Sequence, residues 1–226
     1  MDTTWLQTWF PNTDWADVGR ACIDTLAMLG GSLALTIVLG LPLGVLLFLT
    51  SKRQLLEQRG LYAVLSLVVN ILRSVPFIIL MILMMPVTEH IVGTSLGVLG
   101  AIPPLVVGAA PFFARLVETA LREVDRGIIE ATQAMGASTR QIVLGALLPE
   151  ARPGIIAGIT VTAIALVSYT AMGGAIGAGG LGDLAYRFGY QSFQTDVMVV
   201  TVVLLLVLVQ LLQMLGDKLV TRFSRR

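Results

Sequence analysis

The sequence predicts an all-α integral membrane protein with five transmembrane helices per chain. Two observations support this fold class. Of the 226 residues, 56% are hydrophobic and only 13% are charged, whereas soluble domains carry about 25% charged residues. The hydrophobic residues also form long runs, and a helix needs about 20 of them to cross a bilayer core of about 30 Å. A chain of this composition cannot cover itself with water-facing side chains.

Five runs with little or no charge define the expected spans. We place them at approximately residues 21–50, 61–86, 92–116, 154–176 and 196–216 of a single transmembrane domain that covers residues 1–226. Residues 117–153 connect the third and fourth spans. Connections usually have about 4–6 residues, so this much longer segment must have structure of its own.

Glycine and proline residues in the spans favour a transporter over a simple membrane anchor. Close helix packing is predicted at three small-residue motifs, Gly40-x-x-x-Gly44, Gly93-x-x-x-Gly97 and Gly154-x-x-x-Gly158. Prolines predict helices that are interrupted along a pathway. The prolines concerned are Pro42, Pro76, Pro103, Pro104 and Pro111.

The distribution of positive charge predicts the orientation of the chain. Twelve of the fifteen Lys and Arg residues lie in three places: the connection after the first span, the region of the long connection, and the C-terminus. Cytoplasmic segments carry an excess of Lys and Arg. We therefore expect the N-terminus outside the cell, and the long connection and the C-terminus in the cytoplasm.

Residues that could perform catalysis or bind metals are few. The single cysteine, Cys22, excludes a disulfide framework, and the single histidine, His90, leaves little for zinc or haem binding. Residues 177–182 match the dinucleotide pattern G-x-G-x-x-G, but membrane spans flank them where a βαβ unit is required. The net charge of +1 provides no basic field for nucleic acid. We expect no catalytic residue, metal or cofactor in this chain.

The long connection combines short amphipathic helices with a small-residue interruption. Apolar residues at helical spacing lie on both sides of Gly136 and Ala137, and Pro149 and Pro153 mark the return to the bilayer. A helix with such an elbow suits insertion into a groove on a partner protein. A helix that lies on the lipid surface is the alternative, and the pattern alone does not separate the two.

This segment resembles the EAA loop of bacterial ABC-importer permeases. The matching residues are Glu130-Ala131, Gly136-Ala137 and Leu148-Pro149, and Thr132 stands where the family usually has alanine. In that family the loop forms the coupling helix, which docks into a cleft on the ATP-hydrolysing subunit. The resemblance therefore implies that these six residues couple the chain to an ATPase.

Other segments resemble the methionine-importer permeases in particular. They are Arg73–Phe77, Gly108–Phe112 and Tyr169–Gly174, and the compact five-span size agrees. The resemblance implies the permease subunit of an ATP-driven methionine importer in a bacterial inner membrane, and not an enzyme. The expected partners are a second copy of the chain, a cytoplasmic ABC ATPase dimer that binds ATP and Mg, a periplasmic or lipid-anchored substrate-binding protein, and membrane lipid.

Three residues are candidates for the translocation pathway or its gate: Arg73, Tyr169 and Met172. Arg73 lies within the second apolar run, where it either clamps carbonyl groups freed by Pro76 or lines the pathway. Met172 is a large side chain among small ones near the outer end of the fourth span. Two copies near a dimer axis could form an apolar constriction, and an ordinary packed methionine is the alternative.

Two other functions fit parts of the same pattern. A permease for another amino acid or small solute would have the same loop. An ion-coupled secondary transporter would need acidic residues within the spans, and we expect none there. The acidic residues Glu118, Glu123 and Asp125 are interpreted as solvated surface residues. Glu130 is the exception because of its position in the motif.

Overall fold

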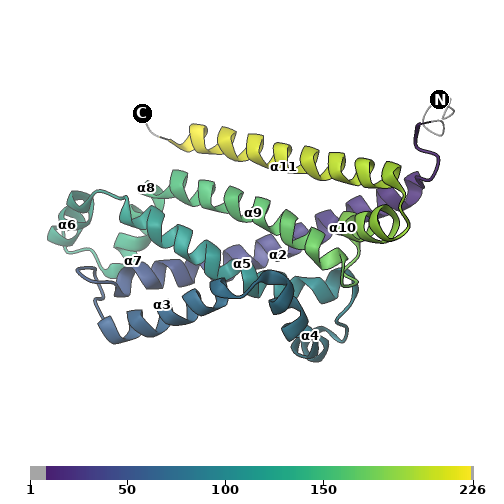
Figure 1. The fold of residues 1–226 in the computed structure, drawn as a ribbon. Coiled ribbons are helices and arrows are strands. Elements are labelled where there is room, and N and C mark those ends of the chain that lie inside the picture. Colours follow the sequence, from purple (N-terminus) through teal and green to yellow (C-terminus); the bar gives the residue numbers. More distant parts are fainter. Residues whose placement is uncertain (1–8, 225–226) are drawn as a thin grey trace. The chain divides into compact units, whose positions relative to one another are not determined.

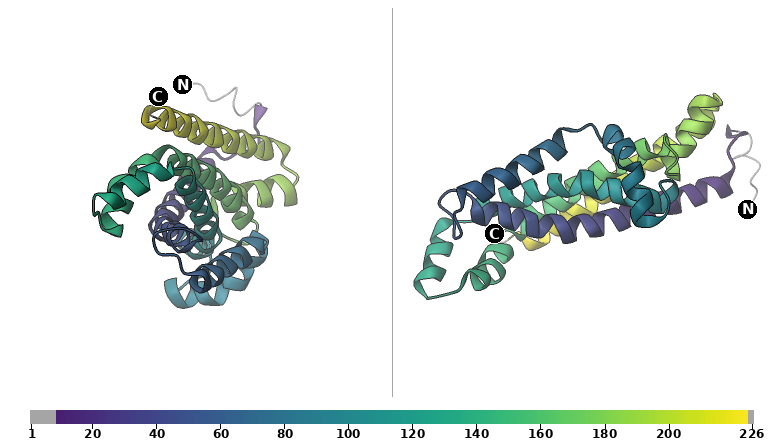
Figure 2. Two further views of the ribbon diagram at one scale, coloured as in Figure 1. Left: turned by 90° about the vertical axis from the view of Figure 1, so that its left-hand side faces the viewer. Right: turned by 90° about the horizontal axis from the view of Figure 1, so that it is seen from below.

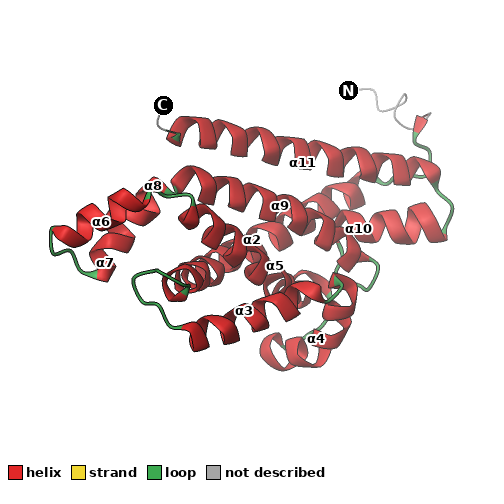
Figure 3. Ribbon diagram, turned by 60° about the vertical axis from the view of Figure 1, so that its left-hand side comes forward, coloured by secondary structure: helices red, strands yellow, loops and turns green. Residues whose placement is uncertain are grey.

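The computed structural model describes residues 9–224, and helices make up most of this part of the chain (Figure 3). No strand occurs among these residues, and the prediction of an all-α fold is confirmed. The elements are given in chain order, and Figure 1 labels the α-helices among them. They are α2 (Trp15–Thr50), α3 (Arg59–Ser74), α4 (Phe77–Val92), α5 (Gly97–Arg122), α6 (Arg126–Ala134), α7 (Thr139–Ile142), the π-helical turn η1 (Val143–Leu147), α8 (Leu148–Glu150), α9 (Arg152–Gly174), α10 (Gly180–Leu184), the π-helical segment η2 (Ala185–Gln191) and α11 (Thr195–Phe223).

Four of these helices, α2, α5, α9 and α11, are long and apolar enough to cross a membrane. The pair α3 and α4 provides a fifth span if the two are counted together, but they are strongly bent at their junction. The single helix expected over residues 61–86 is therefore interrupted. Pro76 is extended, with ψ of 133°, and a proline also disfavours helical backbone at the preceding residue, Val75.

The other prolines do not end their helices. Pro42 lies inside α2, and Pro103, Pro104 and Pro111 lie inside α5. The prediction of interrupted helices is wrong at these positions. A proline inside a helix removes one hydrogen bond, and neighbouring helices can hold the segment together despite that loss.

The chain divides into two compact units, and each long helix contributes to both. The first unit contains the described residues up to Leu35 together with Val75–Gly108 and Ala163–Leu212. The second contains Thr36–Ser74, Ala109–Thr162 and the described residues from Gln213.

The core of the second unit lies between α2, α5, the α6–α7 region and α9. Among its fully buried side chains are Phe48, Phe113, Val117, Leu121 and Leu147. A Cβ atom on Gly44 would lie 2.5 Å from the Ala114 carbonyl oxygen, and one on Gly154 would lie 2.8 Å from the Ala120 Cβ. The small-residue motifs at Gly40–Gly44 and Gly154–Gly158 therefore lie where α2 and α9 approach α5, as predicted.

The third motif, Gly93–Gly97, has a different role. A Cβ on either glycine would meet no atom within 4 Å, and both residues have left-handed backbone, with φ of 82° and 71°. Gly93 ends α4, and its N–H donates to the Glu89 carbonyl. The prediction of close helix packing is wrong here because these glycines form the turn between α4 and α5.

In the first unit, α2 packs against α10 and α11 through Val18, Ala21, Leu181, Leu184 and Val200. The Leu181 N–H donates to the Thr25 hydroxyl at 2.9 Å. A Cβ on Gly180 would lie 2.6 Å from that same oxygen. The glycine-rich segment 177–182 is therefore a close-packed turn that leads into α10.

Acidic and basic side chains line a polar cleft of about 310 Å³ in the first unit. They are Asp17, Arg20, Asp24, Asp183 and Arg187. Asp24 lies inside α2 and inside the expected span at 21–50, so the prediction that the spans contain no acidic residue is wrong. The cleft explains this exception because it gives the carboxylate a polar environment near the start of the helix.

Candidate coupling site

The helix α6 begins at a carboxylate cap. The Asp125 side chain accepts a hydrogen bond from the Gly127 N–H at 2.7 Å, which satisfies a donor at the helix N-terminus. Glu130 lies in the middle of this helix. The Glu130 carboxylate is 3.7 Å from the Arg126 guanidinium, and both side chains are largely exposed.

An elbow separates α6 from α7, as the small residues predict. Gly136 has φ of 77°, and its N–H donates to the Gln133 carbonyl at 2.9 Å. Ser138 then starts α7 with a capping box, in which its side chain and that of Gln141 each accept from the other's backbone N–H. A Cβ on Gly136 would meet no atom within 4 Å. The glycine is therefore required for its left-handed backbone and not for lack of space.

The α6–α7 pair packs into the core of the second unit through one face and exposes the other. Ile129 and Ile142 belong to the buried core, whereas Met135 is 78% exposed. The pair extends from one end of that unit (Figure 2). Of the six predicted coupling residues, Glu130, Ala131 and Gly136 are exposed, and Ala137, Leu148 and Pro149 are half-buried.

Thr132 adds no free polar group to this surface. Its hydroxyl donates to the Ile128 carbonyl at 2.8 Å and to the Ile129 carbonyl at 2.9 Å. The hydroxyl that distinguishes Thr132 from the usual alanine is therefore hydrogen-bonded within the helix.

The chain then returns to α9 through η1 and α8. Pro149 lies two residues after the end of the π-helical turn and has no N–H to continue an α-helical hydrogen-bond pattern, which accounts for the wider turn before it.

A buried ion cluster lies between α3 and α5 in the same unit. The Glu118 carboxylate is 2.7 Å from the Arg115 guanidinium and 2.6 Å from that of Arg122. It also accepts a hydrogen bond from the Tyr62 hydroxyl at 3.2 Å. Arg115 further donates to the Asn70 side chain at 3.0 Å.

The interpretation of Glu118 as a solvated residue is wrong, since its exposed fraction is 4%. Because α5 continues to Arg122, this carboxylate lies inside the helix, between the core residues Val117 and Leu121. The sequence signal that could have revealed the cluster is the spacing Arg115-x-x-Glu118-x-x-x-Arg122 within an apolar helix.

Arg73 lies in the last turn of α3 and is exposed in the chain. Its guanidinium carbon is 5.8 Å from the centre of the Phe112 ring, a cation–π distance. Among the described residues no hydrogen bond from its side chain to a carbonyl beside Pro76 is present, so nothing supports the clamp interpretation. The helix ends one residue later, which places Arg73 beside the bend between α3 and α4.

The other two candidate pathway residues lie one turn apart on α9, in the first unit. The Tyr169 ring stacks on the Phe77 ring with centroids 4.3 Å apart and planes 7° apart. Met172 is 47% exposed. The arrangement leaves the Met172 side chain available for a contact outside the chain and fixes Tyr169 against α4.

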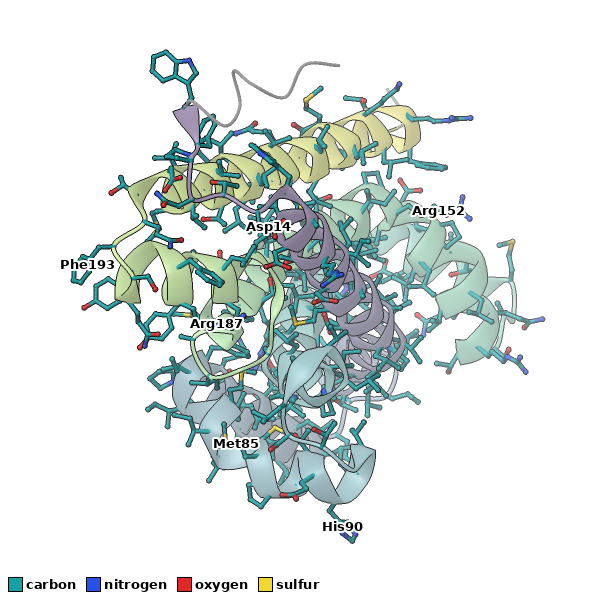
Figure 4. All side chains as sticks on the ribbon, turned by 90° about the vertical axis from the view of Figure 1, so that its right-hand side faces the viewer. Asp14, Met85, His90, Arg152, Arg187 and Phe193 are labelled. Atoms are coloured by element: carbon teal, nitrogen blue, oxygen red, sulfur yellow. The ribbon has the colours of Figure 1, made fainter. Side chains whose placement is uncertain are left out.

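No group of three or more His, Cys, Asp or Glu side chains in the described part of the chain is arranged to hold a metal ion. Figure 4 shows that His90 extends outward from the end of α4.

Comparison with known families decides the class of the chain. The family model of the binding-protein-dependent transport system inner membrane component matches residues 40–226. The chain belongs to this family. It is a membrane-embedded component of a transport system, and the prediction of a permease-type membrane subunit that is not an enzyme is confirmed.

Relatives in this family are similar along almost the whole chain. The probable D-methionine transport system permease protein MetI of Vibrio cholerae is 52% identical over 203 residues, which are 90% of this chain and 90% of the relative. The methionine import system permease protein MetP of Bacillus subtilis is 50% identical over 220 residues, which are 97% and 99% of the two chains.

Solved structures of other transporters have the same fold. A chain in an inward-facing conformation of the MetNI methionine ABC transporter superposes with a TM-score of 0.92 at 50% identity, covering 93% of this chain and 97% of that one. An amino acid ABC transporter chain at 15% identity has a TM-score of 0.75 and shares the fold. The likeness at 50% identity assigns the fold of this chain to the ABC permeases, and the alternative of an ion-coupled secondary transporter is not retained.

Proposed function

We propose that this chain is the membrane-spanning permease subunit of an ATP-driven importer for methionine. The observation that supports the substrate most strongly is the 50% identity to the Bacillus subtilis methionine import permease over nearly the full length of both chains. In this proposal the substrate passes from a periplasmic or extracellular binding protein into the cytoplasm by alternating access. A permease for another amino acid or small solute is the alternative, and no observation favours it.

The proposed assembly contains two copies of the chain and a cytoplasmic ATPase dimer. The ATPase, and not this chain, binds ATP and Mg. One chain of the inward-facing MetNI ABC transporter is 50% identical to this chain, and this likeness supports an ATPase partner. A binding protein that delivers the substrate and the surrounding lipid complete the assembly. The Lys and Arg distribution supports an inner-membrane orientation with the N-terminus outside and the C-terminus in the cytoplasm.

In the proposed mechanism, the exposed surface of α6 around Glu130, Ala131 and Gly136 contacts the ATPase. The opposite face of α6 and α7 is fixed in the core of the second unit through Ile129 and Ile142. A displacement of the coupling helix would therefore be transmitted to α5 and α9 by rigid packing. Met172, Tyr169 and Arg73 remain the proposed residues of the pathway or gate.

A pair of substitutions at Gly136 tests this proposal. Gly136→Leu places a side chain on left-handed backbone at a cost of roughly 1–2 kcal/mol and adds bulk at the elbow. We expect co-purification of the ATPase and uptake of labelled methionine to fall about tenfold or more, since 1–2 kcal/mol alone is a factor of about 5–30. Insertion and dimer formation should be unchanged, because the spans are untouched.

Gly136→Asn is the matched control. Asparagine adopts left-handed backbone more readily than other residues with a side chain, so this variant should retain most ATPase binding and uptake. Uptake is measured with an excess of unlabelled methionine or of another amino acid, which separates the methionine proposal from its alternative. If Gly136→Leu binds the ATPase and imports methionine at the level of the unmodified protein, the coupling assignment is wrong.

A further inference from the structure

The connection between α2 and α3, residues 51–58, lies against the coupling helix. It is held to the end of α2 by backbone hydrogen bonds, from the Leu56 N–H to the Leu49 carbonyl at 3.0 Å and from the Gln58 N–H to the Thr50 carbonyl at 3.1 Å. Leu55 packs against the same buried core that contains Ile129 of α6. The connection is therefore an ordered element of the second unit.

Arg53 has an unusual backbone conformation within this connection. It is one of two described non-glycine residues with positive φ, at 64°. Its N–H donates to the Glu57 carboxylate at 2.9 Å, and the other Glu57 oxygen accepts from the Arg59 guanidinium at 3.0 Å. Both hydrogen bonds lower the pKa of Glu57, and the bond from the Arg53 N–H has the larger effect.

The Arg53 carbonyl is directed at the coupling helix. It accepts a hydrogen bond at 3.2 Å from the guanidinium of Arg126, the first residue of α6. A cleft of about 180 Å³ lies between the connection and α6, lined by Arg53, Gln54, Leu55, Arg126, Ile129, Glu130 and Gln133. The connection and the predicted coupling residue Glu130 thus share one surface.

We propose that residues 51–58 position the coupling helix, with the left-handed backbone of Arg53 presenting its carbonyl to Arg126. This inference rests on the proposed coupling function of α6. Arg53 is a positioning residue that acts through its backbone, while its charged side chain is dispensable. Glu57 supports it by holding the Arg53 N–H, so the chain of contacts runs from Glu57 through Arg53 to the start of α6.

Two substitutions at Arg53 separate the backbone from the charge, because both remove the guanidinium. Arg53→Gly keeps the N–H and the carbonyl and adopts positive φ freely. Arg53→Val keeps both groups, but a β-branched residue is strongly disfavoured at positive φ. We expect Arg53→Gly to retain the methionine imported per ATP hydrolysed within about twofold of the unmodified complex. Arg53→Val should lower it about tenfold, because branching at Cβ adds strain beyond the left-handed cost that arginine already bears.

Hydrogen exchange of the α6 backbone measures the positioning without reference to transport. Residues 126–134 should exchange about tenfold faster in Arg53→Val and at the unmodified rate in Arg53→Gly. Glu57→Ala keeps the residues of Arg53 and α6 but removes the acceptor of the Arg53 N–H. It should therefore speed exchange of α6 as Arg53→Val does, and it provides the test if the valine variant does not accumulate.

Equal coupling losses in Arg53→Gly and Arg53→Val would assign the effect to the lost charge and overturn the proposal. Unchanged α6 exchange in both Arg53→Val and Glu57→Ala would overturn it as well. Failure of the coupling assignment is detected separately, because Gly136→Leu would then bind the ATPase as well as the unmodified protein does. In that case hydrogen exchange of α6 would still show whether residues 51–58 position the helix.

Discussion

Two carboxylates, one in the proposed coupling helix α6 and one shortly before it, have similar sequence surroundings and very different environments. Glu118 lies four residues before Arg122, and Glu130 lies four residues after Arg126, so each forms an i,i+4 ion pair. The Glu118 side chain is 5% exposed and lies 2.7 Å or less from two guanidinium groups. The Glu130 side chain is 69% exposed and lies 3.7 Å from one.

The difference shows that spacing creates an ion pair, whereas burial decides what the pair contributes. Taking Glu118 out of water is costly, and the two arginines and the Tyr62 hydroxyl compensate that cost. Glu130 keeps its hydration and gains little from Arg126. We therefore infer that Glu118 serves the stability of the α3–α5 contact, and that Glu130 is free to contact a partner.

The largest expected effect comes from Glu118→Ala. It leaves Arg115 and Arg122 without their shared carboxylate, and removing one partner of a buried pair costs about 3–5 kcal/mol. Because Arg122 is 43% exposed and can regain water, we expect a loss near the lower end of that range. Thermal unfolding of the purified permease in detergent measures it.

Glu118→Gln is the control for this prediction, since it keeps the shape and the hydrogen-bonding oxygen but removes the charge. It should unfold at a temperature between those of Glu118→Ala and the unmodified protein. A Glu118→Ala variant as stable as the unmodified protein would mean that the cluster does not stabilise the α3–α5 contact.

Features that depend on local sequence could be predicted. The apolar runs identify the helices because a bilayer requires about 20 apolar residues per span. The α6–α7 elbow could be predicted because Gly136 and Ala137 interrupt a helical pattern, and Gly136 has the positive φ that glycine allows. The six coupling residues were chosen by family resemblance, and their role in contacting an ATPase stays a prediction.

Features that depend on packing between distant segments could not be predicted. Pro76 ends a helix and Pro103 does not, although both are prolines in apolar runs. The burial of Glu118 depends on α3, whose Tyr62 is 56 residues away in sequence. The glycines of Gly40–Gly44 meet another helix and those of Gly93–Gly97 form a turn, with identical spacing in both motifs.

A smaller effect is expected from Tyr62→Phe, which removes one hydrogen bond to Glu118 and leaves the arginines in place. A typical hydrogen bond contributes about 0.5–1.5 kcal/mol, and one to a charged group about 1.5–3. At 3.2 Å this bond is long, so we expect a loss of about 1 kcal/mol.

The effect of Tyr62→Phe should also shrink when Glu118 is already glutamine. Thermal unfolding of the two single variants and the double variant measures this coupling. Equal losses in both backgrounds would mean that the Tyr62 hydroxyl acts independently of the carboxylate.

The smallest effect on stability is expected from Glu130→Ala. An exposed i,i+4 pair contributes about 0.3–0.5 kcal/mol, and alanine is a better helix former than glutamate, which offsets part of that loss. The unfolding temperature should therefore stay close to that of the unmodified protein, whereas ATPase binding should weaken if Glu130 contacts the partner.

Glu123→Ala, at another exposed carboxylate of the same region, controls for the loss of one surface charge and should leave ATPase binding unchanged. Were Glu130→Ala to destabilise the protein as much as Glu118→Ala, burial would not distinguish the two carboxylates. Were ATPase binding unchanged, Glu130 would be an ordinary solvated residue, and the coupling contact would have to come from the elbow at Gly136 and its exposed neighbours.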